Sequence, residues 1–429
     1  METTKQEQSK CIYLDYNATT PFAPEVVAAM RPILEGACFG NPSSAHRYGR
    51  EAHAALERAR AQVAALLECD PDEVVLTSGG TESNNTALTC CQPAHIVTSA
   101  VEHPAVRAVC AALAAGPLHT VIHVVPVDSS GLVDPAAVAR ELAAIRAAEA
   151  QAGCTAPSTV LVSVMHANNE VGAVQPIAAI AAAAHAHGAL VHTDAAQSAG
   201  KIDVRVHRLG VDLLSLAGHK LYGPKGVGAL YVRRGADALR GRTLLHGAGH
   251  EHGRRPGTEN VLGATGLGAA CALARAHLAA HAAHTAAVRN ALLHALVANG
   301  MTPDRMRVNG PLGQEQGKQE EEEKPFDVCE TQMLPNTLSV SFRGISAPQL
   351  LAAVGDRVAA SAGAACHSGG ADAASAVSDT LRAMGVPLEW ALGTVRLSVG
   401  RETTFADVRE AARCIADAVN SLQAKEHTA

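Results

Sequence analysis

Polar side chains of particular kinds follow several apolar runs of this sequence. In SLAGHKLYGPKGVGAL (215–230), a single lysine, Lys220, ends the first apolar run, and the glycine and proline residues after it predict a sharp turn. Asp194 follows the run ALVHT, and Gln197 stands three residues later. His103 follows a further run. An amine, a carboxylate, an amide and an imidazole therefore stand at the ends of predicted strands.

The Gly-rich segment TSGGTESNN (77–85) adds a site for an anion. It leads from a predicted strand into a predicted helix, so its backbone N–H groups and the Thr81 hydroxyl can hold a phosphate at the helix N-terminus. Together these groups are the set that pyridoxal 5'-phosphate (PLP) requires. The amine forms a Schiff base, the carboxylate holds the pyridinium proton, and a flat side chain covers the ring. Burial that lowers the pKa of Lys220 would favour its nucleophilic form.

Strands and helices must alternate to position these side chains. Short apolar runs predict strands, and Ala-rich segments such as 176–187 predict helices between several of them. The predicted strands are 73–77, 95–99, 159–165, 189–193, 212–216 and 228–232. The alternation predicts an α/β protein with a mostly parallel sheet covered by helices, in which ligands lie beyond the carboxyl ends of the strands.

The rest of the chain predicts a second, smaller α/β domain. Residues 266–297 are Ala/Leu-rich and helical in pattern, NTLSVSF and TVRLSVG predict strands, and the final residues predict an amphipathic helix. The acidic, low-complexity stretch PLGQEQGKQEEEEKP opens a predicted disordered insertion at about 311–332, although such a charge run would also suit a basic partner.

Composition excludes several classes of protein. The net charge of −6 argues against nucleic-acid binding. No apolar run approaches the roughly 18 residues of a membrane helix, and METTKQEQSK has the features of neither a signal nor a transit peptide, so we expect a cytoplasmic protein. The eleven cysteines contain no CxxC pair, which is typical of free thiols in a reducing compartment. The histidine spacing predicts no metal site.

Eight motifs, in order, resemble those of the selenocysteine lyase/cysteine desulfurase family. They are YLDYNATTP, FGNPSSAHRYGR, TSGGTESNN, MHANNEVGAVQPI, HTDAAQSAGK, GHKLYGPKGVGALYVRR, RPGTEN and SAGAACHS, and the resemblance runs from about residue 12 to about 405. It implies a class V aminotransferase-like enzyme of fold type I, with a seven-stranded, mostly parallel sheet in a large PLP-binding domain (26–266). It also implies a small C-terminal domain (267–429), which the N-terminal arm (1–25) joins.

The resemblance also implies roles for residues around the cofactor. Lys220 would form the Schiff base and remove the substrate α-proton, and His103 would stack on the ring and move protons. Asp194 would pair with the pyridine nitrogen, and Gln197 with the phenolic oxygen. The phosphate would bind to Gly80, Thr81 and His219, and Thr258 would reach the phosphate of a neighbouring subunit, which implies a homodimer.

Substrate residues follow from the same resemblance. Asn17 and Asn169 would lie beside the substrate, Asn169 also beside the cofactor, and Arg396 would bind the α-carboxylate. Cys366 would take the sulfur or selenium, which a separate acceptor protein could then receive. Its surroundings, AGAACHSGGADAAS, are small and polar, as in a loop that presents a thiol.

Each residue also has a structural alternative. Lys220 could be a surface lysine, and His103 a plain loop histidine. Asp194 could cap the following helix, Arg396 could form an ion pair between domains, and Cys366 could be an inert loop cysteine.

The resemblance leaves the substrate open between two amino acids. Two features favour selenocysteine lyase: the segment AACHS after SAG, and Ala217 at a position where cysteine desulfurases often carry a serine. In contrast, Pro104 after His103 favours cysteine desulfurase. We therefore expect PLP-dependent removal of selenium or sulfur, with selenocysteine lyase as the preferred activity and cysteine desulfurase as the alternative. An aminotransferase would leave Cys366 without a task, and a non-catalytic scaffold-binding protein would not need Lys220 and Asp194.

Overall fold

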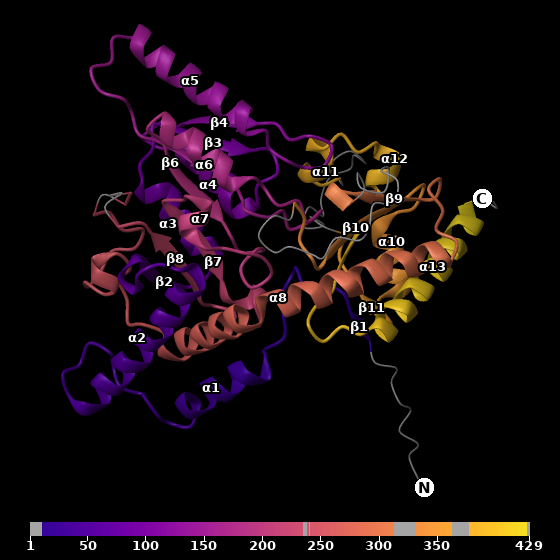
Figure 1. Ribbon diagram of the computed structural model, residues 1–429, viewed down its shortest axis with the longest axis horizontal. Helices are drawn as coiled ribbons and strands as arrows, with labels where there is room; N and C mark the ends of the chain where they lie inside the picture. The colour runs from indigo at the N-terminus through magenta and orange to yellow at the C-terminus, as the bar shows by residue number, and fades with distance from the viewer. Residues whose placement is uncertain (1–10, 235–237, 240, 313–331, 363–376, 427–429) are drawn as a thin grey trace.

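The computed structural model describes residues 11–234, 238–239, 241–312, 332–362 and 377–426. A larger α/β part carries β2 to β8, and a smaller part carries β9 to β12 with α10 to α13, as Figure 1 shows. The long helix α8 (Val261–Ala298) runs from one part into the other. The predicted insertion at about 311–332 lies almost wholly outside the described residues.

The larger part is built on a seven-stranded sheet with the order β2-β8-β7-β6-β5-β3-β4. All its strands are parallel except β8, which pairs with β2 and β7 in antiparallel register, so the predicted mostly parallel sheet is confirmed. The strands are β2 (Val74–Thr77), β3 (His95–Ser99), β4 (Val121–Val125), β5 (Val160–Ser163), β6 (Leu190–Asp194), β7 (Leu213–Ala217) and β8 (Gly228–Val232). β4 was not predicted, because it is an edge strand whose sequence, VIHVV, is interrupted by a histidine and largely exposed.

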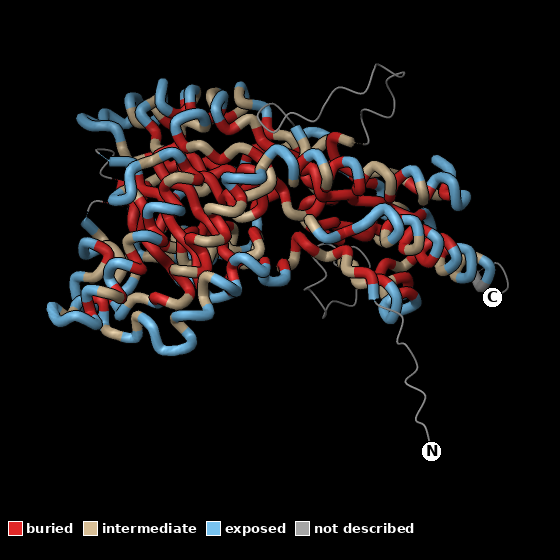
Figure 2. Tube along the Cα trace, turned by 60° about the horizontal axis from the view of Figure 1, so that its bottom comes forward, coloured by how far each residue is buried: buried red, intermediate tan, exposed pale blue. Residues whose placement is uncertain are grey.

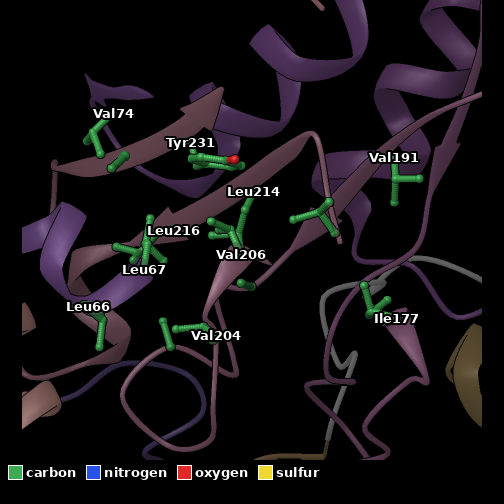
Figure 3. Close-up of a cluster of buried hydrophobic side chains, with 14 of the residues drawn as sticks. Leu66, Leu67, Val74, Ile177, Val191, Val204, Val206, Leu214, Leu216 and Tyr231 are labelled. Carbon is green, nitrogen blue, oxygen red and sulfur yellow. The ribbon is translucent and has the colours of Figure 1, made fainter. Parts of the chain in front are cut away.

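Alternating side chains of most strands are buried on the two opposite faces of this sheet. Val74, Leu214, Leu216 and Tyr231 lie in one core, part of which is drawn in Figure 3. Their strand neighbours, such as Leu213, lie in a second core on the opposite face. The first core is covered by α1 (Pro24–Leu34), α2 (Arg47–Leu67), α5 (Pro135–Gln151), α6 (Ile177–Ala186) and α8, and the second by α3 (Gly80–Cys90) and α4 (Pro104–Ala115). This double burial explains why the strands read as continuous apolar runs.

A separate core holds the smaller part together. It joins side chains of α8 from Val288 onward to a three-stranded antiparallel sheet of order β12-β10-β9 and to α13 (Phe405–Glu426). The strands are β9 (Met306–Asn309), β10 (Thr337–Phe342) and β12 (Thr394–Ser398). The remaining elements are η1 (Pro71–Glu73), α7 (Val206–Leu209), η2 (Gly218–Lys220), η3 (Glu251–Gly253), α10 (Ala347–Val354), α11 (Asp379–Ala383) and α12 (Leu388–Ala391).

The N-terminal arm packs into this smaller core. Its strand β1 (Ile12–Tyr13) pairs in parallel with β11 (Val358–Ala359), and Leu14 is fully buried there. The domain limits at 25/26 and 266/267 stay a prediction, and the second of them falls inside α8. α8 is the one described helix long and apolar enough to cross a membrane, but its buried side chains belong to the cores of both parts, whose interiors are red in Figure 2.

Candidate functional site

A cavity of about 220 Å³ lies beyond the carboxyl ends of the parallel strands. Residues that follow β2, β3, β5, β6 and β7 all reach it, because parallel strands end at the same edge of a sheet. Eight of the residues predicted from the sequence line this cavity: Gly80, Thr81, His103, Asn169, Asp194, Gln197, His219 and Lys220. The sheet thus gathers side chains that are up to 140 residues apart in the chain.

Lys220 enters the cavity from η2, directly after β7. Its Nζ donates to the backbone carbonyl oxygens of Asn17 (2.6 Å) and Ala18 (2.8 Å). Burial lowers the pKa of Lys220 to about 8, and repulsion from Arg396 adds to this effect. Lys220 is therefore a half-buried amine with a raised tendency to be neutral, and not a surface lysine.

Asp194 is the last residue of β6 and is buried at the cavity wall. Its Oδ1 accepts from the backbone N–H of Ala196 (2.9 Å), but a turn and not a helix follows β6, so the alternative that Asp194 caps a helix is wrong. Its Oδ2 accepts from Asn84 Nδ2 (2.7 Å). Asn84 was not predicted as a site residue, although positions 80, 81 and 84 share one face of a helix that begins at Gly80.

Two histidines flank the cavity. His103 is the N-cap of α4, where its Nδ1 accepts from the backbone N–H of Ala105 (3.1 Å). Burial lowers the pKa of His103, attraction by Asp194 opposes this, and repulsion from Lys220 adds to it. Burial and Lys220 also lower the pKa of His219 to about 4, so His219 is neutral at physiological pH.

The N-terminus of α3 provides the anion site. Gly79, with φ of +146°, turns the chain from β2 into α3, a backbone conformation that favours glycine. The first N–H groups of a helix have no intrahelical partner, and they carry partial positive charge. Gly80 and Thr81, in this first turn, line the cavity together with His219, which makes this end of the cavity suitable for a phosphate.

Three predicted site residues do not line the cavity. Asn17 is fully buried, and its side chain bonds to Thr337, Asn336 and Lys201 while its carbonyl accepts from Lys220. Arg396 pairs with Asp15 (Nη2–Oδ1 2.7 Å) and donates to the carbonyl of Asn169 (3.0 Å). Thr258 is exposed just before α8.

The substrate roles of Asn17 and Arg396 and the intersubunit role of Thr258 stay predictions. Among the described residues, buried Arg396 Nε has no hydrogen-bond partner, so the guanidinium keeps one free donor beside its ion pair with Asp15. Cys366 lies outside the described residues. No group of three metal-ligating side chains occurs in the part of the chain that the structure describes.

The donor set of the cavity fits PLP. Lys220 offers an amine of lowered pKa, and the helix N-terminus at Gly80 lies on the same cavity for the phosphate. The buried carboxylate of Asp194, fixed by Asn84 and Ala196, has the chemistry to hold a pyridinium proton. The neutral His103 imidazole is a flat group that can cover the ring.

Incorporation of PLP is expected to depend on pH through Lys220. With a pKa of about 8, about one amine in ten is neutral at pH 7, compared with fewer than about one in a thousand for an ordinary lysine. The rate at which PLP-free protein forms its cofactor absorbance band should rise with pH and level off above about pH 8. A rate that continues to rise through pH 10 would show an ordinary lysine.

Comparisons with known proteins agree on one family. Residues 12–303 match the family model described as aminotransferase class-V. A cysteine desulfurase of Gluconacetobacter diazotrophicus is 42% identical over 405 residues, which are 92% of this chain and 90% of that protein. The cysteine desulfurase IscS of Dictyoglomus turgidum is 37% identical over 404 residues, 92% of this chain and 91% of that protein. A solved NifS-like protein superposes with a TM-score of 0.79 at 32% identity, covering 96% of this chain and 100% of that one.

Proposed function

Because the chain belongs to the class V aminotransferase family of PLP-dependent enzymes, and its cysteine desulfurase relatives support an enzyme that cleaves carbon–sulfur bonds, we propose that it is a cysteine desulfurase. Its substrate would be L-cysteine and its amino-acid product L-alanine. The observation that carries the proposal is the single cavity lined by Lys220, Asp194 and His103 in a chain similar to cysteine desulfurases over 92% of its length. The cofactor stores the electrons that the substrate releases when its α-proton is removed.

The chain's own residues divide the remaining tasks. Lys220, as a neutral amine at the cavity wall, binds the cofactor and then takes the α-proton of the substrate. The carboxylate of Asp194 keeps the pyridine nitrogen protonated. In the neutral tautomer whose Nδ1 accepts from Ala105, His103 carries its proton on Nε2 and can move it at the cavity.

Sulfur would leave through Cys366, which the structure does not describe. In this step the thiolate of Cys366 attacks the substrate sulfur, an S–S bond forms, and the Cβ–S bond breaks with its electron pair on Cβ. Cβ takes a proton and becomes the methyl group of alanine, and the enzyme keeps a persulfide. Atoms and electrons balance without an added oxidant or reductant.

Of the two activities expected from the sequence, cysteine desulfurase is better supported than the preferred selenocysteine lyase. The relatives reported above are named cysteine desulfurases. Ala217, one of the residues that favoured selenium, lines the cavity beside Gly80 without a polar group that would distinguish the two substrates. The AACHS segment that also favoured selenium falls in the undescribed range 363–376.

Turnover of the PLP-loaded protein on L-cysteine and L-selenocysteine side by side tests this proposal. We expect alanine from L-cysteine, a persulfide on Cys366, and loss of sulfur release in Cys366→Ala. Cys154→Ala is the matched control, since Cys154 is an exposed free cysteine that does not line the cavity. Sulfur release by Cys366→Ala at the wild-type rate, or alanine from L-selenocysteine alone, would overturn the assignment.

We further propose that the enzyme acts as a homodimer and passes its sulfur to an acceptor protein. Support for the dimer comes from Thr258, which the resemblance places at the neighbouring subunit's phosphate and which is exposed in this chain. Sedimentation of the PLP-loaded protein would measure the mass in solution.

A further inference from the structure

Lys201 is a half-buried lysine to which none of the roles above is assigned. It lies in the turn after β6, where the carbonyl of Ser198 accepts from the backbone N–H groups of Lys201 and Ile202 at 3.0 Å each. Its Nζ donates to Gln197 Oε1 (2.9 Å) and to Asn17 Oδ1 (3.0 Å). Burial, with repulsion from Lys220 and Arg396, lowers the pKa of Lys201 well below its ordinary range. Such burial is costly unless hydrogen bonds compensate it, and the two side-chain oxygens provide them.

The contact with Lys201 decides which end of the Gln197 amide faces the cavity. An amide presents either its oxygen or its NH₂ to a neighbour, and the partners determine the orientation. Lys201 donates to Gln197, so the oxygen must face Lys201. Gln197 Nε2 then donates to the carbonyl of Asn17 (3.0 Å), the same carbonyl that accepts from Lys220 Nζ (2.6 Å). The N–H end of the amide therefore lies on the Lys220 side, where Gln197 lines the cavity.

The hydrogen bonds form a closed ring of three residues. Lys201 binds the side-chain oxygens of Gln197 and Asn17, and Gln197 binds the backbone carbonyl of Asn17. Asn17 Oδ1 has a second donor, Asn336 Nδ2 (3.0 Å), so it stays satisfied without Lys201. Gln197 Oε1 accepts its hydrogen bond from Lys201, and the Gln197 residue is only 6% exposed. Loss of Lys201 therefore affects Gln197 more than Asn17, because an unsatisfied buried acceptor drives the amide to rotate.

We propose that Lys201 is a positioning residue that holds Gln197 with its N–H, and not its oxygen, toward the phenolic oxygen of bound PLP. A donor stabilises negative charge on that oxygen, whereas a rotated amide would place one oxygen against another. The inference rests on bound PLP and on the place that the family resemblance gives to Gln197. It does not depend on whether the substrate is L-cysteine or L-selenocysteine.

The test is an absorbance titration of the PLP-loaded protein without substrate. The band of the cofactor bound to Lys220 changes when it loses its proton, and a donor at the phenolic oxygen lowers the pH midpoint of this change. In Lys201→Met we expect the midpoint to rise by roughly one pH unit, the size expected for one hydrogen bond to a charged group. Lys201→Gln, which keeps one donor, should give a smaller rise and serves if Lys201→Met does not fold.

The same substitution in a Gln197→Ala protein distinguishes positioning through Gln197 from a direct electrostatic effect of Lys201 on the cofactor. If Lys201 acts through Gln197, Lys201→Met should leave the midpoint unchanged in a protein that already carries Gln197→Ala. An equal rise in both backgrounds would show that the charge of Lys201 acts on the cofactor directly, and no rise in either would show that Lys201 has no role there. Both results would overturn the inference.

The control variant is Lys225→Met, which removes an exposed lysine from the turn after Lys220 and should leave the midpoint in place. The absorbance titration also tests the role of Lys201 separately from the proposed cysteine desulfurase activity. A protein that releases no sulfur from L-cysteine would refute the cysteine desulfurase assignment while the absorbance titration still decides the role of Lys201.

Discussion

Replacing Lys220 by alanine is expected to remove the cofactor absorbance band and to lower turnover by at least about four orders of magnitude. The same amine attaches the cofactor and takes the substrate proton, so two catalytic contributions are lost together. The half-buried position of Lys220 at the cavity, and the fall of its pKa to about 8, make it the residue suited to both tasks. Alanine formation and the absorbance spectrum of the purified variant measure the two losses.

Lys225→Ala is the matched control for this variant. It removes a lysine from the same turn, but one whose side chain is exposed and does not line the cavity. It should keep both the band and the turnover. If Lys220→Ala formed alanine as fast as the wild-type protein, Lys220 could not be the residue that binds the cofactor.

Asp194→Asn is expected to lower kcat by at least about a hundredfold, the size of effect seen when one electrostatic group is removed from an active site. The carboxylate favours the protonated pyridine nitrogen, and the neutral amide does not, so the cofactor stores electrons less well. Ala196 and Asn84 donate to different oxygens of Asp194. In the variant the remaining oxygen can still accept from Ala196, and Asn84, whose Oδ1 has no hydrogen-bond partner among the described residues, can turn its amide to accept from the new NH₂, so the shape of the site should be retained. Steady-state rates on L-cysteine and a thermal melt would be measured together.

Asp212→Asn is the control for Asp194→Asn, because it removes the charge of a buried carboxylate that lies away from the cavity. Asp212 is buried before the first residue of β7, at the opposite end of the sheet from the cavity, and it pairs with Arg233 and the backbone N–H of Val191. Its replacement should lower the melting temperature while kcat changes little. A wild-type kcat in Asp194→Asn would refute the role of Asp194.

Local patterns were enough to predict most of the sheet. The runs at 95–99 and 228–232 coincide with β3 and β8 because strands buried on both faces need nearly every residue to be apolar. The same rule failed for β4, an edge strand interrupted by His123, whose exposed side leaves no continuous apolar signal.

The site was predictable wherever a residue followed a strand. Lys220, Asp194 and His103 stand directly after predicted strands or in the turns beyond them, and parallel strands bring such positions to one edge. Asn84 and Lys201 gave no such signal. Each contacts a partner from a distant segment, Asn84 with Asp194 and Lys201 with Asn17.

The sequence by itself determined the chemistry available to this protein: an amine, a carboxylate, an imidazole and a phosphate-binding turn, each placed by a local pattern of apolar and turn residues. Only the tertiary structure decided the state of those groups. The pKa of Lys220 and the orientation of the Gln197 amide depend on burial and on neighbours such as Asn17, Lys201 and Arg396. Asn17 and Arg396 come from distant segments of the chain, and burial and hydrogen-bond partners arise from how the segments pack, which no local pattern encodes.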